Sequence, residues 1–195
     1  MTRMSQTSGV RRLAKVLLLA LAVSAASVAC EPFTATSTST TTPTSTTQSA
    51  PTVALLDRAT DIDGQPIGAM SGDEKATIAI VFASWCGHCR NEMRELAVLR
   101  SDRSDVRYLG INYVQHEEYD GRGNSVAVRA MRDDLAPWLR VIPAGEMLWA
   151  QLGSPTKVPT IYIFDRHGVL AKTYDRRFDA LPTFDELERV IASLP

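Results

Sequence analysis

The sequence predicts an α/β fold, with a mixed central sheet flanked by helices and preceded by an export segment and a flexible linker. Two features of the 195 residues support the domain: apolar, β-branched runs alternate with helical patterns after residue 53, and 45% of all residues are apolar, as in ordinary globular proteins. A third feature, the contrast between a basic, apolar start and a Ser/Thr-rich tract, separates the appendages from that domain.

Residues 1–29 are predicted to be a signal peptide. Four basic side chains and no acidic one precede or border the apolar run Val16–Val23, which leads into small residues ending at Ala29. The stretch 16–29 is shorter than the roughly 20 residues that a membrane-spanning helix needs. The alternative, a buried core helix, lacks a partner face nearby in the sequence.

Cys30 follows Ser27-Val-Ala29, which resembles the lipobox of bacterial lipoproteins. The resemblance implies that Cys30 becomes the lipidated first residue of the mature chain, although leucine is usual where Ser27 stands. An ordinary cleavage site with an incidental cysteine is the alternative. The prediction is an exported protein, lipid-anchored to a bacterial membrane and facing the periplasm or the cell exterior.

Residues 30–52 are predicted to combine the lipidated cysteine with a flexible linker. Between Thr34 and Ser49, 13 of 16 residues are Ser or Thr. Such a tract buries too little apolar surface to offset the entropy of ordering, so it suits a spacer between an anchor and a domain.

The charge is distributed unevenly along the chain. Residues 1–30 hold 4 of the 21 basic residues and none of the 22 acidic ones, so the remainder has 17 basic against 22 acidic residues and a net charge of -5. A chain of this sign is not expected to bind nucleic acid, and its membrane attachment depends on the lipid rather than on a basic surface.

Residues 53–195 form the predicted domain, whose first elements come from local composition. Asp61-Ile-Asp-Gly64 predicts a hairpin turn; the same letters begin a calcium loop, but the remaining ligands are missing. The continuous apolar run Ala76–Ala83 suits a central, doubly covered strand. A helix is expected over about 87–101, and Val106–Tyr113 reads as the next strand.

The second half of the domain continues the alternation. Gln115–Asn124 is expected to be a solvated loop, with a partner-recognition insert or a metal site as alternatives. The remaining expected elements are helices at Ser125–Leu139, Ala144–Leu152 and Asp185–Ser193, and strands at Thr160–Asp165 and from Val169 to about Tyr174, joined by a turn at Arg166–Gly168.

The chemistry is predicted at Trp85-Cys-Gly-His-Cys89, between the buried strand and the helix. Cys86 falls at the helix N-cap, where free amides and the helix dipole stabilise a thiolate, and protonated His88 adds positive charge. Cys89 is placed to attack a mixed disulfide at Cys86. A structural bridge or a zinc half-site is the alternative, although zinc needs two more ligands and the chain has only three histidines.

This motif, together with Val158-Pro159-Thr160 opening a later strand, resembles the thioredoxin superfamily. The resemblance covers most of 53–195 and implies a thioredoxin-like fold with a cis peptide bond at Val158–Pro159. It further implies that Trp85, Val158 and Pro159 contact the substrate chain.

The pattern is most similar to the membrane-tethered reductases of the TlpA/ResA type, whose glutamate six residues after the first cysteine corresponds to Glu92. On a helical wheel Glu92 lies three residues from Cys89, at the edge of the apolar stripe. A carboxylate there has a raised pKa when desolvated and can exchange protons during thiol chemistry. The alternative is a solvated surface glutamate. Ile80 replaces the buried aspartate of cytoplasmic thioredoxins.

Two departures concern the direction of electron flow. Gly87-His88 is the dipeptide of protein disulfide isomerases, and Arg94 stands where the TlpA/ResA type often has proline. Histidine stabilises the reduced thiolate and so makes the disulfide more oxidising.

The predicted function is an extracytoplasmic thiol–disulfide oxidoreductase, acting as a reductant without an organic cofactor or metal. Its expected partners are protein thiols and disulfides, with apocytochrome c as an example implied by the resemblance, and a membrane electron donor. The alternatives are a disulfide oxidase or isomerase, a copper metallochaperone holding the metal through Cys86, Cys89 and His167, and an inert tethered binding module.

Overall fold

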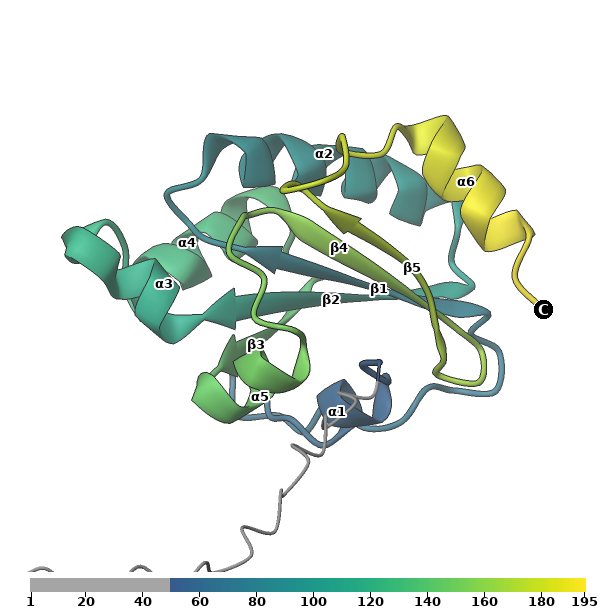
Figure 1. Cartoon of the computed structure of the whole chain (residues 1–195), viewed down its shortest axis with the longest axis horizontal. Coiled ribbons are helices and arrows are strands. Elements are labelled where there is room, and N and C mark those ends of the chain that lie inside the picture. Colours follow the sequence, from purple (N-terminus) through teal and green to yellow (C-terminus); the bar gives the residue numbers. More distant parts are fainter. Residues whose placement is uncertain (1–49) are drawn as a thin grey trace, which may run out of the picture. The chain divides into compact units, whose positions relative to one another are not determined.

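The computed structural model describes residues 50–195, and the predicted signal peptide, Cys30 and the Ser/Thr tract lie outside them. A five-stranded mixed sheet has the order β3-β2-β1-β4-β5 (Figure 1). Strands β3, β2 and β1 pair in parallel, whereas β4 pairs antiparallel with β1, and β5 pairs antiparallel with β4. The strands are β1 (Ala76–Phe82), β2 (Val106–Tyr113), β3 (Arg140–Ala144), β4 (Thr160–Asp165) and β5 (Leu170–Asp175).

Helices cover both faces of this sheet. Figure 1 shows α2 and α6 on one face and α1 and α5 on the other. Helix α4 packs against α2. The helical segments are α1 (Ala54–Asp57), α2 (Gly87–Asp102), α3 (Val114–Glu118), the 3-10 turn η1 (Tyr119–Gly121), α4 (Ser125–Leu135), α5 (Glu146–Gln151) and α6 (Phe184–Ala192). This arrangement confirms the predicted α/β architecture with a mixed sheet.

The central strand β1 is buried along its whole length, as its continuous apolar run predicted. It pairs with β2 on one side and with β4 on the other, and helices cover both of its faces. A strand in this position has no solvent-facing side and therefore no alternating pattern. Its rigid carboxyl end carries the loop that leads to Cys86.

Three expectations from the sequence were wrong. Most of Gln115–Asn124 is exposed as expected, but it is not an irregular loop, because α3 and η1 occupy its first part. The helix that begins at Ser125 ends at Leu135 rather than Leu139, since Ala136 precedes Pro137 and has an extended φ of -150°. Strand β3, with Pro143 inside it, was not expected. Ala144, the expected first residue of a helix, is the last residue of this strand, and α5 begins at Glu146.

Strand β3 lies at one edge of the sheet, where the proline is tolerated. The turn that begins at Asp61 covers this edge: the Ile62 amide donates to the Val141 carbonyl at 2.8 Å. The expected tight turn is present, with Gly64 at φ 80°, and it is closed by a single bridge between Thr60 and Pro66. An edge covered in this way has fewer free backbone groups for unwanted strand pairing.

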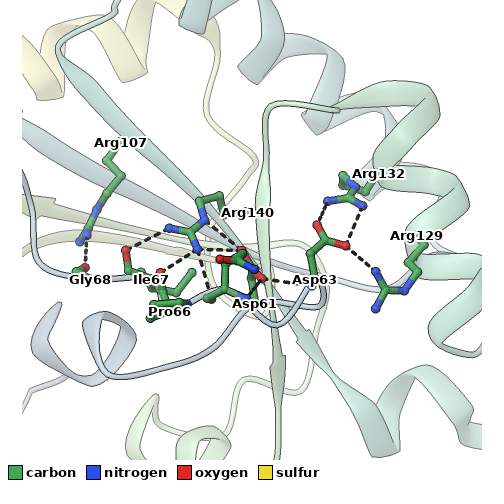
Figure 2. A network of polar contacts seen from close by, with 10 residues as sticks. Asp61, Asp63, Pro66, Ile67, Gly68, Arg107, Arg129, Arg132 and Arg140 are labelled. Atoms are coloured by element: carbon green, nitrogen blue, oxygen red, sulfur yellow. Dashed lines mark hydrogen bonds and ion pairs between the residues drawn. The ribbon is translucent and has the colours of Figure 1, made fainter.

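Two aspartates of this turn fasten it to the rest of the domain (Figure 2). Asp61 accepts from the Arg140 guanidinium at 2.7 Å, and Arg140 also donates to the carbonyls of Pro66 and Ile67. Asp63 pairs with Arg129 and Arg132 of α4. We call Asp61, Asp63, Arg129, Arg132 and Arg140 the edge clamp. The carboxylates of both aspartates are thus paired with arginine side chains.

Candidate active site

Cys86 lies between the end of β1 and the start of α2, at the helix N-cap. Its backbone is extended, with ψ 112°, and its sulfur accepts a hydrogen bond from the Cys89 amide at 3.3 Å. The thiols of Cys86 and Cys89 are both free and buried, with exposed fractions of 7% and 0%. The two thiols thus differ in access, and Cys86 is the more exposed of the two.

The surroundings of the two thiols shift their pKa values in opposite directions. A hydrogen bond from the Cys89 thiol, assisted by the amides of Cys89 and His88 and by the charge of His88, lowers the pKa of Cys86 to about 6 against the effect of burial. Burial, together with the adjacent Cys86 sulfur, raises the pKa of Cys89. Cys86 is therefore mainly a thiolate at neutral pH, while Cys89 keeps its proton.

The segment before β4 completes the wall of the site opposite the thiols. The Val158–Pro159 peptide bond is cis, as predicted. The Val158 carbonyl oxygen lies 3.7 Å from the Cys86 sulfur, and it accepts a hydrogen bond from Arg176 Nη1 at 2.9 Å. The predicted juxtaposition of Val158, Pro159 and the cysteine pair is thus present in the structure.

Glu92 is a buried carboxyl group in α2, one turn beyond Cys89. Its side chain is only 4% exposed, and Oε1 has no hydrogen-bond partner among the described residues. Burial, with a smaller effect from the charge of Glu95, raises the pKa of Glu92 to about 7. The expectation of a desolvated carboxyl group is therefore met, and the alternative of a solvated surface glutamate was wrong.

Trp85 is held by a residue from the segment that the sequence predicts as a solvated loop. Glu117 of α3 is 1% exposed and accepts from the Ser84 amide at 2.8 Å, from the Ser84 hydroxyl and from Asn112 Nδ2 at 2.8 Å. The Glu117 carbonyl accepts from the Trp85 indole at 3.2 Å. Helix α3 is thereby fixed to the two residues that precede Cys86.

A glycine makes room for this buried carboxylate. A Cβ added at Gly123 would lie 1.9 Å from Glu117 Oε1, so any larger residue would displace the Glu117 carboxylate from its partners. No local signal separates Glu117 from Glu118 in the sequence, because its partner Ser84 lies 33 positions earlier. Sequence reasoning therefore missed Glu117, Ser84 and Asn112.

Two neighbouring hollows lie on the surface at this site, and Cys86 lines the first of them. The first, of about 400 Å³, is lined by residues of the active-site loop, of α3 and of the segment before Pro159, among them Trp85, Cys86 and Val158. The second, of about 300 Å³, has aromatic walls that include Tyr113, Tyr119 and Trp149. Both include His116 and Thr156, so together they offer an extended surface beside Cys86.

The other predicted ligand does not join the site. His167 lies in the turn after β4, whereas Pro159 lies before the start of that strand. A six-residue strand is about 20 Å long, so His167 lies at the opposite end of the sheet from Cys86 and cannot share a metal with it. Within residues 50–195, no group of three or more His, Cys, Asp and Glu side chains is arranged to hold a metal ion.

Neither a protein-family model nor a curated protein matches the sequence. Solved structures do. A secreted Mycobacterium tuberculosis disulfide oxidoreductase homologous to Escherichia coli DsbE is 19% identical, with a TM-score of 0.55 over 72% of this chain and 97% of the other. A Chlorobium tepidum thiol:disulfide interchange protein of the thioredoxin family is 19% identical, with a TM-score of 0.58 over 74% and 94%.

An exposed lipoprotein thioredoxin from Streptococcus pneumoniae is similar to the same extent, at 19% identity and a TM-score of 0.55 over 70% of this chain and 97% of the other. At such identities the likeness establishes the fold. The chain from residue 50 onward has a thioredoxin-like fold, as the resemblance of its motifs implied. In the part of the chain that the structure covers, no helix is long and apolar enough to cross a membrane.

Proposed function

We propose that this chain is a thiol–disulfide oxidoreductase that exchanges disulfides with protein substrates through Cys86 and Cys89. The observation that carries the proposal is the placement of two free cysteines at the N-terminus of α2, where the Cys86 sulfur accepts from the Cys89 amide and lies 3.7 Å from the Val158 carbonyl of the cis Val158–Pro159 segment. These surroundings lower the pKa of Cys86 to about 6 and raise that of Cys89. A nucleophilic thiolate beside a protonated partner is the arrangement that stepwise exchange requires. Two of the proteins with similar structures are a disulfide oxidoreductase and a thiol:disulfide interchange protein.

The exchange has two steps. The Cys86 thiolate attacks one sulfur of a substrate disulfide, forms a mixed disulfide and releases the other sulfur as a thiolate. Cys89 then loses its proton, attacks the Cys86 sulfur and releases the second substrate sulfur, leaving an intramolecular Cys86–Cys89 disulfide. Two electrons pass from the cysteine pair to the substrate. We assign Glu92 the role of accepting the Cys89 proton, because it is buried one turn further along α2 with a pKa near neutrality.

Trapping with Cys89→Ser tests the proposed roles of Cys86 as the nucleophile and Cys89 as the resolving thiol. The variant retains the nucleophile and lacks the resolving thiol, so it should accumulate mixed disulfides that are visible on non-reducing gels and disappear on reduction. The matched control is Cys86→Ser, which retains Cys89 and should trap nothing. Equal trapping by the two variants, or none by either, would overturn the proposal.

For the direction of electron flow we propose reduction, as the TlpA/ResA resemblance implied. A second candidate, an oxidase or isomerase, is favoured by one specific observation: the low pKa of Cys86, which stabilises the reduced form and makes the disulfide more oxidising. Equilibration with glutathione separates the two. A potential near the roughly -270 mV of thioredoxin supports a reductant, and one near or above about -180 mV supports the second candidate.

The setting that we propose is extracytoplasmic, with Cys30 lipidated and residues 31–52 serving as the linker. Support comes from the basic, apolar and Ser/Thr-rich pattern of the first 52 residues, and from the similarity to a protein that is an exposed lipoprotein. Apocytochrome c and a membrane electron donor are proposed partners. Metabolic labelling with a radioactive fatty acid tests the anchor: label is expected in the natural chain, and its presence in Cys30→Ala would contradict the assignment.

A further inference from the structure

The hollow around Cys86 is basic. Arg122, Lys157 and Arg176 line it together with His88 and His116, and no acidic side chain of the described residues lines it. The three cations with permanent charge come from different parts of the fold: the loop before α4, the segment before Pro159 and the residue after β5. Burial lowers the pKa of His116, so this residue adds little charge at neutral pH.

These cations have weak carboxylate partners or none within the described residues. Arg176 donates to the neutral carbonyl of Val158. Lys157 is exposed and has no carboxylate within 4.0 Å in the region from residue 50 onward. Arg122 lies over the ring of Trp85 at 5.2 Å, and the carboxylate that it approaches, Asp120, is 3.9 Å away with both side chains more than half exposed.

The surplus of positive charge is local. The chain after residue 30 has a net charge of -5, and the arginines of the edge clamp are paired with aspartates. At Cys86, by contrast, an approaching substrate meets three cations that have at most one weak carboxylate partner, against the single negative charge of the Cys86 thiolate. A hollow lined by one sign of charge raises the local concentration of oppositely charged ligands and their association rate.

We propose that the preferred substrates of Cys86 are protein segments with acidic side chains next to their disulfide-bonded cysteine. The inference rests on the proposed function and names its substrate class. Acidic neighbours would lie against Arg122 and Lys157 while the substrate sulfur meets Cys86. Basic neighbours would be repelled at the same positions, so the hollow selects among exposed disulfides by charge.

The experiment uses the full chain in its reduced form and short peptides of equal length. Each peptide carries one cysteine as a mixed disulfide with thionitrobenzoate, flanked by glutamates, glutamines or lysines. Attack of Cys86 on the peptide sulfur releases the coloured thionitrobenzoate anion, and Cys89 then releases the peptide thiol. The rate of colour release in single turnover, corrected for the rate with free glutathione, reports the preference.

The glutamate peptide should react about 10-fold or more faster than the lysine peptide at low ionic strength, and the ratio should fall toward one at about 1 M salt, where the Debye length is about 3 Å. Lys157→Glu and Arg122→Glu should each lower the ratio. Arg166→Glu is the matched control: it makes the same change in net charge in the turn after β4, at the opposite end of the sheet, and should leave the ratio unchanged.

The outcomes separate the two proposals. Cys86-dependent release at equal rates from all three peptides, or a ratio insensitive to salt, would overturn the acidic preference and leave the oxidoreductase proposal standing. Release that is no faster than with Cys86→Ser for any peptide would overturn the oxidoreductase proposal itself. Because the salt dependence needs no variant, the test remains decisive even where a charge reversal beside Pro159 prevents folding.

Discussion

The edge clamp and the cysteine site differ in whether their charged side chains are paired. In the clamp, the carboxylates of Asp61 and Asp63 are matched with guanidinium groups (Figure 2). Burial opposes ionisation of Asp61, but hydrogen bonds from Arg140 and from two backbone amides outweigh it and lower its pKa. At the cysteine site, Glu92 is buried, and its Oε1 accepts no hydrogen bond from any group within residues 50–195. This burial raises the pKa of Glu92 to about 7.

This difference separates groups that hold the fold from groups that react. A paired carboxylate stays ionised through the neutral range and exchanges no protons there. An unpaired buried carboxyl group titrates near neutrality, at the expense of stability, and is available for proton transfer. The same contrast applies to the cations, which are paired in the clamp and largely unpaired around Cys86.

Among the substitutions considered, Glu92→Gln should have the largest effect, because it removes the unpaired carboxyl group from the cysteine site. Without the Glu92 carboxyl group to accept the Cys89 proton, the resolving step should slow by about 100-fold, and the mixed disulfide should last longer. Quenched-flow trapping of that intermediate measures the rate. Glu95→Gln, on the same helix but exposed, is the matched control, and an equal effect of both variants would contradict the role of Glu92.

The same variant tests the pKa of Glu92 through stability. Because the folded-state pKa of about 7 is above the ordinary value of 4.5, the folded state binds the proton more tightly, and wild-type stability falls as the pH rises from about 4.5 to about 7. Glu92→Gln has no carboxyl group to ionise and so lacks this loss. Above pH 7 its free energy of unfolding should exceed that of the wild type by about 2–3 kcal/mol. Urea unfolding at the two ends of the range measures it; a constant difference would contradict the raised pKa.

Asp61→Ala should have a smaller effect, and on stability alone. The Asp61 side chain is 6% exposed, but that of Arg140 is 38% exposed and regains water when its partner is lost. The expected loss is therefore about 2 kcal/mol in the free energy of unfolding. The folded-state pKa of Asp61 is lowered, so its contribution is present above about pH 4 and lost as the pH falls further. A change in the pKa of Cys86 in this variant would show that the two regions are not independent.

Arg129→Ala should have the smallest effect. The side chains of Arg129 and Asp63 are 45% and 43% exposed, and Asp63 retains Arg132 as a partner. Exposed pairs contribute little because water screens them. The unfolding midpoint is expected to stay within experimental error of the wild type. A loss as large as that of Asp61→Ala would show that the clamp depends on its exposed half.

Local pattern was sufficient for most of the fold. The apolar run of β1, the N-cap position of Cys86 and the proline before β4 each depend on neighbours in sequence, and their positions were predicted. Strand β3 was missed because its proline is acceptable only at a sheet edge, and that edge is defined by tertiary pairing. Glu117 was missed for the same reason, since a buried carboxylate is recognised by distant partners such as Ser84.

The candidate site divides in the same way. The spacing of Cys86, Cys89 and Glu92 on one helix follows from helical geometry alone. The basic lining does not, because Arg122, Lys157 and Arg176 come from three separate segments that only the folded sheet brings to Cys86. Their sign also opposes the net charge, which gave no hint of a cationic hollow.

The proposed chemistry requires that one of two adjacent thiols is a thiolate at neutral pH and that the other is not. Ultraviolet absorbance of the thiolate in the reduced chain, recorded against pH with Cys86→Ser as the reference, measures this difference. We expect a transition with the amplitude of one thiol and a midpoint near pH 6, which disappears in Cys86→Ser. Two thiols that titrate together near the value of about 8.5 for free cysteine would contradict it.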